Sequence, residues 1–144
     1  MYSYFDSSLL CAILFDESLF EEAWDIWNSS KARVSSILLK IETNVSLQRH
    51  YKTNAHSLDD NWLTKKEKIL NSLLDDVFYK AIDESFGNVI AKDKTIIGCK
   101  SLDAIHIATA LFFEKYSRDQ KLAICSFDNN ILAVAKQLGF ETFG

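Results

Sequence analysis

Residues 122–132 have the sequence LAICSFDNNIL, and this stretch decides the fold class. The consecutive apolar residues from Leu122 to Cys125 predict a strand buried on both faces, as inside a parallel sheet. Asp128 follows this strand after two residues, and apolar residues then recur at helical spacing from Ile131 until Gly139, a residue typical of helix ends. The stretch therefore predicts a strand, an acid and a helix in that order.

The same alternation of strands and helices extends through the rest of the chain. Further short strands are predicted at 2–5, 33–35, 77–79 and 140–143. Further helices are predicted at 7–15, 19–27, 37–45, 62–74, 82–90 and 101–112, with polar loops at 50–58 and 92–100. Ser35 or Ser36 is expected to cap the third helix, and Ser101 the helix after the second loop. We therefore expect one α/β domain over residues 1–144: a three-layer α/β/α sandwich around a mostly parallel sheet of about five strands.

Composition restricts the class of protein. The chain has 144 residues, 48% hydrophobic and 25% charged, which is typical of one globular domain and excludes a disordered chain. A net charge of -4 excludes a basic protein that coats nucleic acid, but not an enzyme that contacts it locally. The 3 cysteines are widely spaced, which favours free thiols over a disulfide framework or a zinc site. With no segment typical of a signal peptide or membrane span, we expect a cytoplasmic protein that does not bind membranes.

Four acids are the candidate functional residues. Asp6 and Asp128 follow predicted strands, so both are expected at the carboxyl edge of the sheet, where ligands bind in such folds. Asp103 opens a predicted helix, and Glu42 lies inside another, beside an apolar stripe formed by Leu38, Ile41 and Val45. A doubly wound fold can bring all four acids to one crevice.

Each acid also has a structural interpretation. Asp6 and Asp128 are placed to cap helices, and Asp103 is placed in a first helical turn, where the helix dipole favours an anion. A buried carboxylate in the middle of a helix is costly unless it is paired or binds a metal. For Glu42 the structural interpretation is an ion pair with Lys40 or Arg49.

The order of these acids resembles the PIN domain family. Residues 5–10, FDSSLL, resemble the opening of a PIN domain, and Glu42 in residues 34–42, VSSILLKIE, resembles its second acidic motif. Residues 101–110, SLDAIHIATA, are similar to the third motif of VapC-type toxins, and residues 125–132, CSFDNNIL, resemble the fourth. Ser126 stands where many members have threonine, which keeps the hydroxyl group. The segment 50–100 has no matching motif, although substrate choice would lie there.

The resemblance implies a ribonuclease that depends on Mg2+ or Mn2+, with one or two ions, and that leaves 5′-phosphate and 3′-hydroxyl ends. Hard divalent cations prefer oxygen ligands, and the four acids supply them. Asp6 and Asp103 are expected to be the best metal ligands, while Glu42 and Asp128 complete the site directly or through water. Ser7 and Ser126 are expected to hold a carboxylate or a metal-bound water, or to be ordinary cap residues.

The remaining polar and aromatic residues that stand out in the sequence are better explained by structural roles than by catalysis. His106 lies three residues after Asp103, on the same side of the helix, and a hydrogen-bonded core histidine is favoured over a general base. Trp24 and Trp27 share a helical face suited to core packing or a dimer surface. The lysines at 65, 66 and 68 are typical of a solvated helix face.

The partners implied by the resemblance are an RNA substrate, a small antitoxin that blocks the crevice, and a second copy of the chain. The leading hypothesis is the endoribonuclease toxin of a type II toxin–antitoxin pair. An alternative is a non-catalytic PIN-like module that binds RNA or protein. A phospho-acceptor signalling domain also places aspartates at strand ends, but it needs an acidic pair near the first strand, and Asp16 lies a helix away from Asp6.

Overall fold

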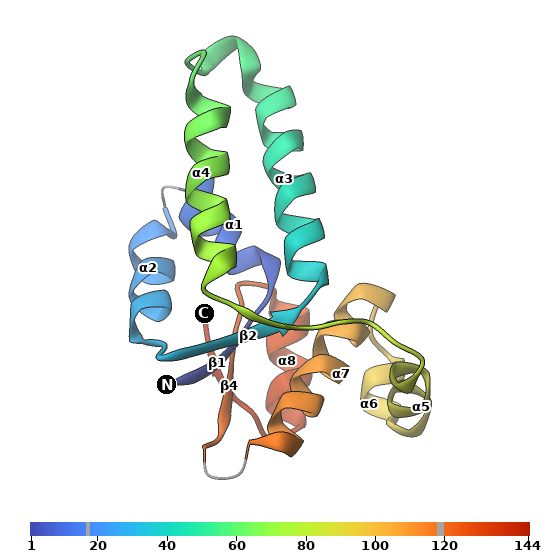
Figure 1. Cartoon of the computed structure of the whole chain (residues 1–144). Helices are drawn as coiled ribbons and strands as arrows, with labels where there is room; N and C mark the ends of the chain where they lie inside the picture. Colours follow the sequence, from blue (N-terminus) through green and yellow to red (C-terminus); the bar gives the residue numbers. More distant parts are fainter. Residues whose placement is uncertain (17, 118–119) are drawn as a thin grey trace.

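A parallel sheet forms the centre of the molecule in the computed structural model, which describes residues 1–16, 18–117 and 120–144 (Figure 1). Within those residues the sheet is five-stranded, in the order β3-β2-β1-β4-β5, and every pairing is parallel. The strands are β1 (Tyr2–Phe5), β2 (Ala32–Ser36), β3 (Phe78–Lys80), β4 (Leu122–Cys125) and β5 (Glu141–Phe143). The predicted strand count and parallel arrangement are confirmed, and the bounds of β1 and β4 match the prediction.

Helices cover both faces of the sheet because consecutive side chains of the central strands point to opposite sides. Phe5 of β1 and Cys125 of β4 belong to one core, whereas Tyr4 and Ile124 belong to the other. The first core is completed by α1 (Ser7–Phe15), α2 (Phe20–Ser29), α3 (Leu38–Asn54) and α4 (Trp62–Asp75). The second is completed by α6 (Lys94–Ile97), α7 (Ser101–Tyr116) and α8 (Asn129–Gln137), and α5 (Ser85–Lys92) packs on α7. The predicted three-layer arrangement is therefore confirmed.

The predicted loop at 50–58 is wrong. Helix α3 continues to Asn54, and a short 3-10 turn, η1 (Ala55–Ser57), follows before α4 begins. The cause is tertiary packing, since the ring of His50 stacks between Phe15 of α1 and Trp62 of α4, at centroid distances of 4.5 and 5.4 Å. A polar stretch with this aromatic support remains helical, and α3 and α4 form a hairpin that projects beyond the sheet (Figure 1).

The predicted apolar stripe of the third helix is wrong at two of its three residues, although Leu38 is buried as predicted. Ile41 is 54% exposed and Val45 is exposed as well, whereas the buried face includes Leu39, Thr43 and Leu47. Thr43 belongs to a buried face because its hydroxyl donates to the carbonyl of Leu39 at 2.6 Å, which satisfies the polar group inside the helix. A pattern of apolar residues leaves out a buried threonine whose hydroxyl bonds to its own helix, so it does not identify this face.

Two predicted helix starts and one predicted loop differ in detail from the structure. Helix α3 begins at Leu38, and Ser35 and Ser36 lie in β2, but the Ser36 hydroxyl accepts from the backbone N–H of Leu38 at 3.2 Å, as the predicted serine cap requires. Lys100, not Ser101, occupies the N-cap position of α7. The predicted loop at 92–100 contains α6, whose first turn is capped by Asp93 through the backbone N–H of Thr95 at 2.8 Å. Several neighbouring polar residues can cap the same helix start, so spacing alone does not identify the residue that does so.

Gly139 ends α8 as predicted, with φ at +86°, a conformation that favours glycine. No helix within the three described ranges is long and apolar enough to cross a lipid bilayer.

Candidate active site

The candidate site lies at the carboxyl edge of the sheet, between β1 and β4, where the order in which strands are added to the sheet reverses. From β1 the chain moves outward to β2 and β3, and it later returns to place β4 on the opposite side of β1. Asp6 directly follows β1, and Asp128 lies three residues after the end of β4. Phe5 pairs with Cys125, so these two segments leave the sheet side by side. Ligands of open α/β sheets bind at such a switch point.

Asp6 is almost fully buried, and both of its carboxylate oxygens accept hydrogen bonds. The hydroxyl of Ser8 donates to Oδ1 at 2.7 Å, and that of Ser126 donates to Oδ2 at 2.8 Å. Asp6 occupies the N-cap position of α1, but its side chain makes no cap hydrogen bond, so the carboxylate does not serve as a helix cap. Burial raises the pKa of Asp6, while the hydrogen bonds from Ser8 and Ser126 act in the opposite direction.

The serine hydroxyls also join the two segments that leave the sheet. The Ser8 hydroxyl accepts from the backbone N–H of Phe127 at 2.8 Å, and the Ser126 hydroxyl accepts from that of Asp128 at 2.9 Å. In the described part of the chain, no side-chain hydrogen bond of Ser7 is found. Sequence reasoning chose Ser7 and missed Ser8. The sequence shows two serines directly after Asp6, but their spacing does not indicate which hydroxyl contacts the carboxylate.

Asp128 caps α8. Its Oδ1 accepts from the backbone N–H of Asn130 at 2.7 Å and of Ile131 at 3.4 Å. The structural interpretation of this residue therefore holds. Both cap hydrogen bonds are accepted by Oδ1 of Asp128. The carboxylate therefore caps α8 and also contributes negative charge to its surroundings.

Asp103 lies in the first turn of α7, half-buried, in the electrostatic field of two other candidate acids. Burial raises its pKa, and the negative charges of Asp128 and Glu42 raise it further. The positive charge of Lys100 acts in the opposite direction but does not cancel the increase. Burial is the largest cause of the raised pKa, and the added contributions of Asp128 and Glu42 indicate that negative charge converges here.

Glu42 reaches the site from α3 and is held by a histidine. Its Oε2 lies 2.7 Å from Nε2 of His106, whereas Nζ of Lys40 lies over the ring of Tyr79 at 4.4 Å. Within the described residues, Glu42 therefore pairs with His106 and not with Lys40 or Arg49, the partners expected from the sequence. The His106 ring is 2% exposed, and its Nδ1 lies 2.7 Å from the hydroxyl of Tyr4, in agreement with the interpretation as a hydrogen-bonded core histidine.

The donor types at this edge fit a hard divalent cation. Carboxylate and hydroxyl oxygens are the ligands such ions prefer, and a cation would compensate the charge that raises the pKa of Asp103. Within the described ranges, however, no three His, Cys, Asp or Glu side chains lie close enough to share one ion. An ion here would therefore keep water ligands, as Mg2+ commonly does in proteins.

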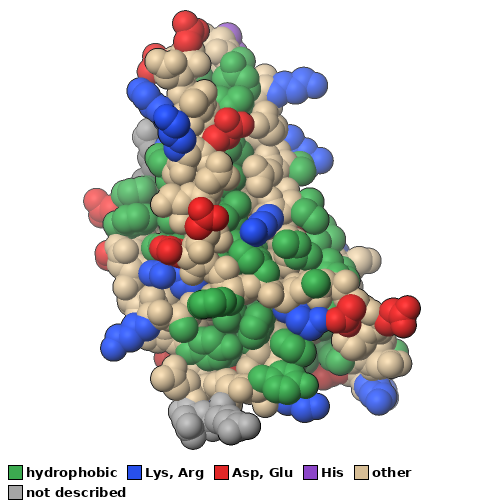
Figure 2. Space-filling view, in the orientation of Figure 1, with side chains coloured by type: hydrophobic (Ala, Val, Ile, Leu, Met, Phe, Trp, Pro, Cys, Tyr) green, Lys and Arg blue, Asp and Glu red, His purple; other side chains and the backbone are tan. Residues whose placement is uncertain are grey.

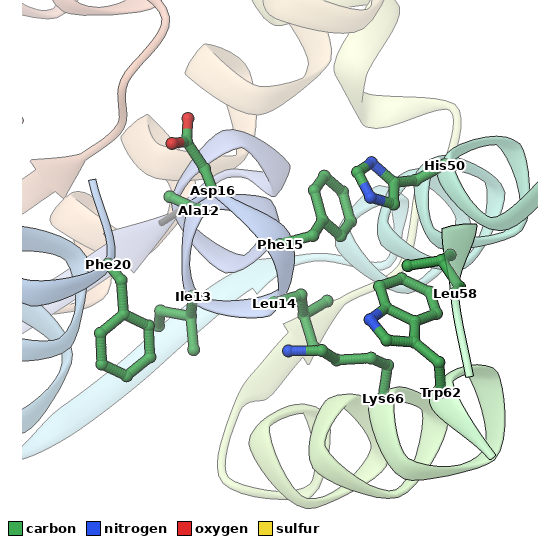
Figure 3. Close-up of a pocket in the computed structure, with 10 residues that line it drawn as sticks. All are labelled: Ala12, Ile13, Leu14, Phe15, Asp16, Phe20, His50, Leu58, Trp62 and Lys66. Atoms are coloured by element: carbon green, nitrogen blue, oxygen red, sulfur yellow. The ribbon is translucent and has the colours of Figure 1, made fainter. Parts of the chain in front are cut away.

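A separate cavity of about 240 Å³ lies between α1, α3 and α4 (Figure 3). Figure 3 shows the rings of Phe15, His50 and Trp62 along one side of it, with Lys66 below and Asp16 pointing away from them. None of the four candidate acids lines this cavity. The aromatic rings add to the core contacts between the α3–α4 hairpin and α1, so the cavity belongs to the junction of the hairpin with α1.

Comparison with known proteins agrees with the geometry. The family model described as PIN domain matches residues 3–137. The crystal structure of PAE2754 from Pyrobaculum aerophilum is similar, with a TM-score of 0.57 and 16% sequence identity, covering 99% of this chain and 83% of that one. At this identity the likeness concerns the fold alone. A search of curated proteins found no match.

Proposed function

The chain belongs to the PIN domain family, whose members are generally metal-dependent nucleases, and from that premise we propose that it is an endoribonuclease that hydrolyses RNA phosphodiesters with Mg2+ or Mn2+. The observation that carries the proposal is the pairing of Phe5 with Cys125, which brings the acids that follow them, Asp6 and Asp128, to one edge of the sheet. Burial and the charges of Asp128 and Glu42 also raise the pKa of Asp103. Together with Asp6, these acids border the switch point of the sheet, where substrates bind in such folds.

The proposed division of roles follows the position of each side chain. Asp6 and Asp103 hold one or two divalent ions, while Glu42 and Asp128 complete the ligand set directly or through water. Ser126 keeps the Asp6 carboxylate in place, as its bond to Oδ2 supports, and Ser7 remains a candidate for holding a water. When bound, the metal supplies an activated water and stabilises charge that develops on the phosphodiester.

We further propose that the protein is the toxin of a VapBC-type toxin–antitoxin pair and that it forms a homodimer. The toxin proposal rests on the resemblance of residues 101–110 to the VapC motif. Exposed apolar side chains support the dimer: Phe78, on the edge strand β3, is 72% exposed, and Tyr116, at the end of α7, is also exposed. Figure 2 shows apolar side chains gathered below the α3–α4 hairpin, as is typical of protein contact surfaces. A small antitoxin that blocks the crevice would regulate the enzyme.

The test is incubation of the purified protein with defined RNAs in Mn2+ or in EDTA, followed by mapping of the product ends. We expect cleavage only with metal, and products with 5′-phosphate and 3′-hydroxyl ends. Asp60→Asn is a suitable control variant because Asp60 is exposed at the turn between α3 and α4, away from the candidate acids. Cleavage that persists in EDTA, or that Asp60→Asn removes, would contradict the proposal.

One observation favours the alternative of a non-catalytic PIN-like module that binds RNA or protein. In residues 1–16, 18–117 and 120–144 no ready-made cluster of three metal-ligating side chains is present. Calorimetric titration with Mn2+ separates the two functions. The nuclease proposal expects saturable binding that Asp103→Asn weakens, whereas a non-catalytic module expects RNA binding that EDTA leaves unchanged.

A further inference from the structure

His106 connects the core of the protein to the candidate site. It lies one helical turn after Asp103 on α7, and its buried ring lies between Tyr4 of β1 and Glu42 of α3. Both ring nitrogens have hydrogen-bond partners within 2.7 Å, so neither is free to accept a proton from a water. The ring is therefore placed to hold other groups, and a general-base role does not agree with its contacts.

The hydrogen bonds around Tyr4 assign the proton on the imidazole ring. The backbone N–H of Ser36 donates to the Tyr4 hydroxyl oxygen at 3.2 Å, so the hydroxyl proton is free to be donated elsewhere. Burial raises the pKa of Tyr4, which keeps the hydroxyl protonated. Because the Glu42 carboxylate can only accept, the bond at its Oε2 places the ring proton on Nε2, and Nδ1 of the neutral ring then accepts from the Tyr4 hydroxyl.

We propose that His106 is a positioning residue for Glu42, and that Tyr4 fixes the tautomer in which Nε2–H donates to the Glu42 carboxylate. This proposal rests on the proposed function, in which Glu42 takes part in metal binding. Glu42 comes from α3 and Asp103 from α7, so the bond to His106 ties the Glu42 side chain to the helix that carries Asp103. Partners of this kind orient a ligand before the metal arrives, and their loss typically weakens metal affinity.

Two substitutions separate positioning from mere packing. In His106→Gln the side-chain nitrogen lies the same number of bonds from Cβ as Nε2, so it still reaches Glu42. In His106→Asn it lies as far as Nδ1, so it reaches Tyr4 but not Glu42. Calorimetric titration of the full chain with Mn2+ is expected to give a dissociation constant about 10–100-fold weaker for His106→Asn. His106→Gln is expected to restore most of the affinity.

Equal affinity losses in the two variants, or unchanged affinity in His106→Asn, would overturn the positioning role while the wild type still binds Mn2+ and cleaves RNA. A wild type that neither binds Mn2+ nor cleaves RNA would contradict the proposed function, and the role of His106 with it.

A second measurement begins with the wild type, so its first result does not depend on whether a variant folds. Nitrogen NMR of the wild-type imidazole in EDTA is expected to show His106 protonated at Nε2 and unprotonated at Nδ1. In Tyr4→Phe this preference is expected to weaken, because Nδ1 loses its donor. Protonation at Nδ1 in the wild type would overturn the tautomer assignment.

Discussion

The hydroxyl of Ser126 donates a hydrogen bond to Oδ2 of Asp6 over 2.8 Å, although the two residues are 120 positions apart in the chain. The same hydroxyl accepts from the backbone N–H of Asp128. One small side chain thus joins the end of β1 to the start of α8. It holds one candidate metal ligand and the backbone of another, which makes the pair sensitive to loss of a single oxygen atom.

Ser126→Ala is expected to lower both stability and activity. Removal of the hydroxyl takes one donor from the buried Asp6 carboxylate and leaves the Asp128 N–H without its acceptor, at a cost of about 1–3 kcal/mol in the free energy of unfolding. Urea denaturation measures this loss, and RNA cleavage under saturating Mn2+ measures the effect on the site. Ser72→Ala is the matched control, because Ser72 is exposed on α4 and outside the proposed site, and its change is expected to lie within about 0.5 kcal/mol. Similar losses in both variants would contradict a special role for Ser126.

Asp103→Asn is expected to abolish RNA cleavage while leaving the metal-free fold at least as stable as the wild type. The pKa of Asp103 is raised in the folded state, so its ionisation disfavours folding when no cation is present. Amide substitution removes that charge with little change in shape. Thermal melting in EDTA and an RNA cleavage assay check the two halves of the prediction. Cleavage at the wild-type rate would show that Asp103 is not part of the site.

The same raised pKa gives a pH dependence with a defined sign. The folded protein binds the Asp103 proton more tightly than the unfolded chain, whose aspartate pKa is about 3.9. This stabilisation is complete below the unfolded pKa and is lost as pH rises through the folded pKa. The advantage of Asp103→Asn over wild type in EDTA should therefore be smallest in acid and grow towards neutral pH. An advantage that shrinks as pH rises would contradict the raised pKa.

Mn2+ is expected to raise the melting temperature of the wild type. A ligand that binds only the folded state at 100 times its dissociation constant stabilises by about 2.7 kcal/mol, which corresponds to several degrees for a chain of this size. EDTA should reverse the shift, and Asp103→Asn should reduce it. Asp60→Asn should retain it, because this exposed acid is not among the proposed ligands. The absence of any shift at millimolar Mn2+ would argue against a metal site.

The sheet could be predicted from the sequence because its signals are local. The apolar run of β4 predicts a buried strand with the bounds that the structure has, and the acids after β1 and β4 indicate the edge at which they lie. The buried face and the length of α3 could not be predicted in the same way. Its buried face depends on Thr43 bonding to its own helix, and its length depends on His50 stacking between two other helices.

The candidate site could be predicted as a set of residues but not as a set of contacts. The choice between Ser7 and Ser8 depends on which hydroxyl faces Phe127, more than a hundred residues later. The bond between Glu42 and His106 joins residues 64 positions apart, and the spacing of three between Asp103 and His106 indicated only that they share a helix side. Contacts of this kind become definite only when the layers of the fold are assembled.

The corrected face of α3 leads to a stability prediction independent of catalysis. Leu47 is fully buried in the core beneath α1 and α4, whereas Ile41 is more than half exposed on the same helix. Leu47→Ala removes buried methyl groups and leaves a cavity, so we expect a loss of about 2–5 kcal/mol in the free energy of unfolding. Ile41→Ala removes apolar atoms of the same number from a largely solvated position, and alanine favours the helix, so its effect should lie within about 0.5 kcal/mol. Urea denaturation of both variants measures the difference directly. A large loss for Ile41→Ala with a small one for Leu47→Ala would place Ile41 and Val45 on the buried face with Leu38 and would rotate Glu42 away from His106.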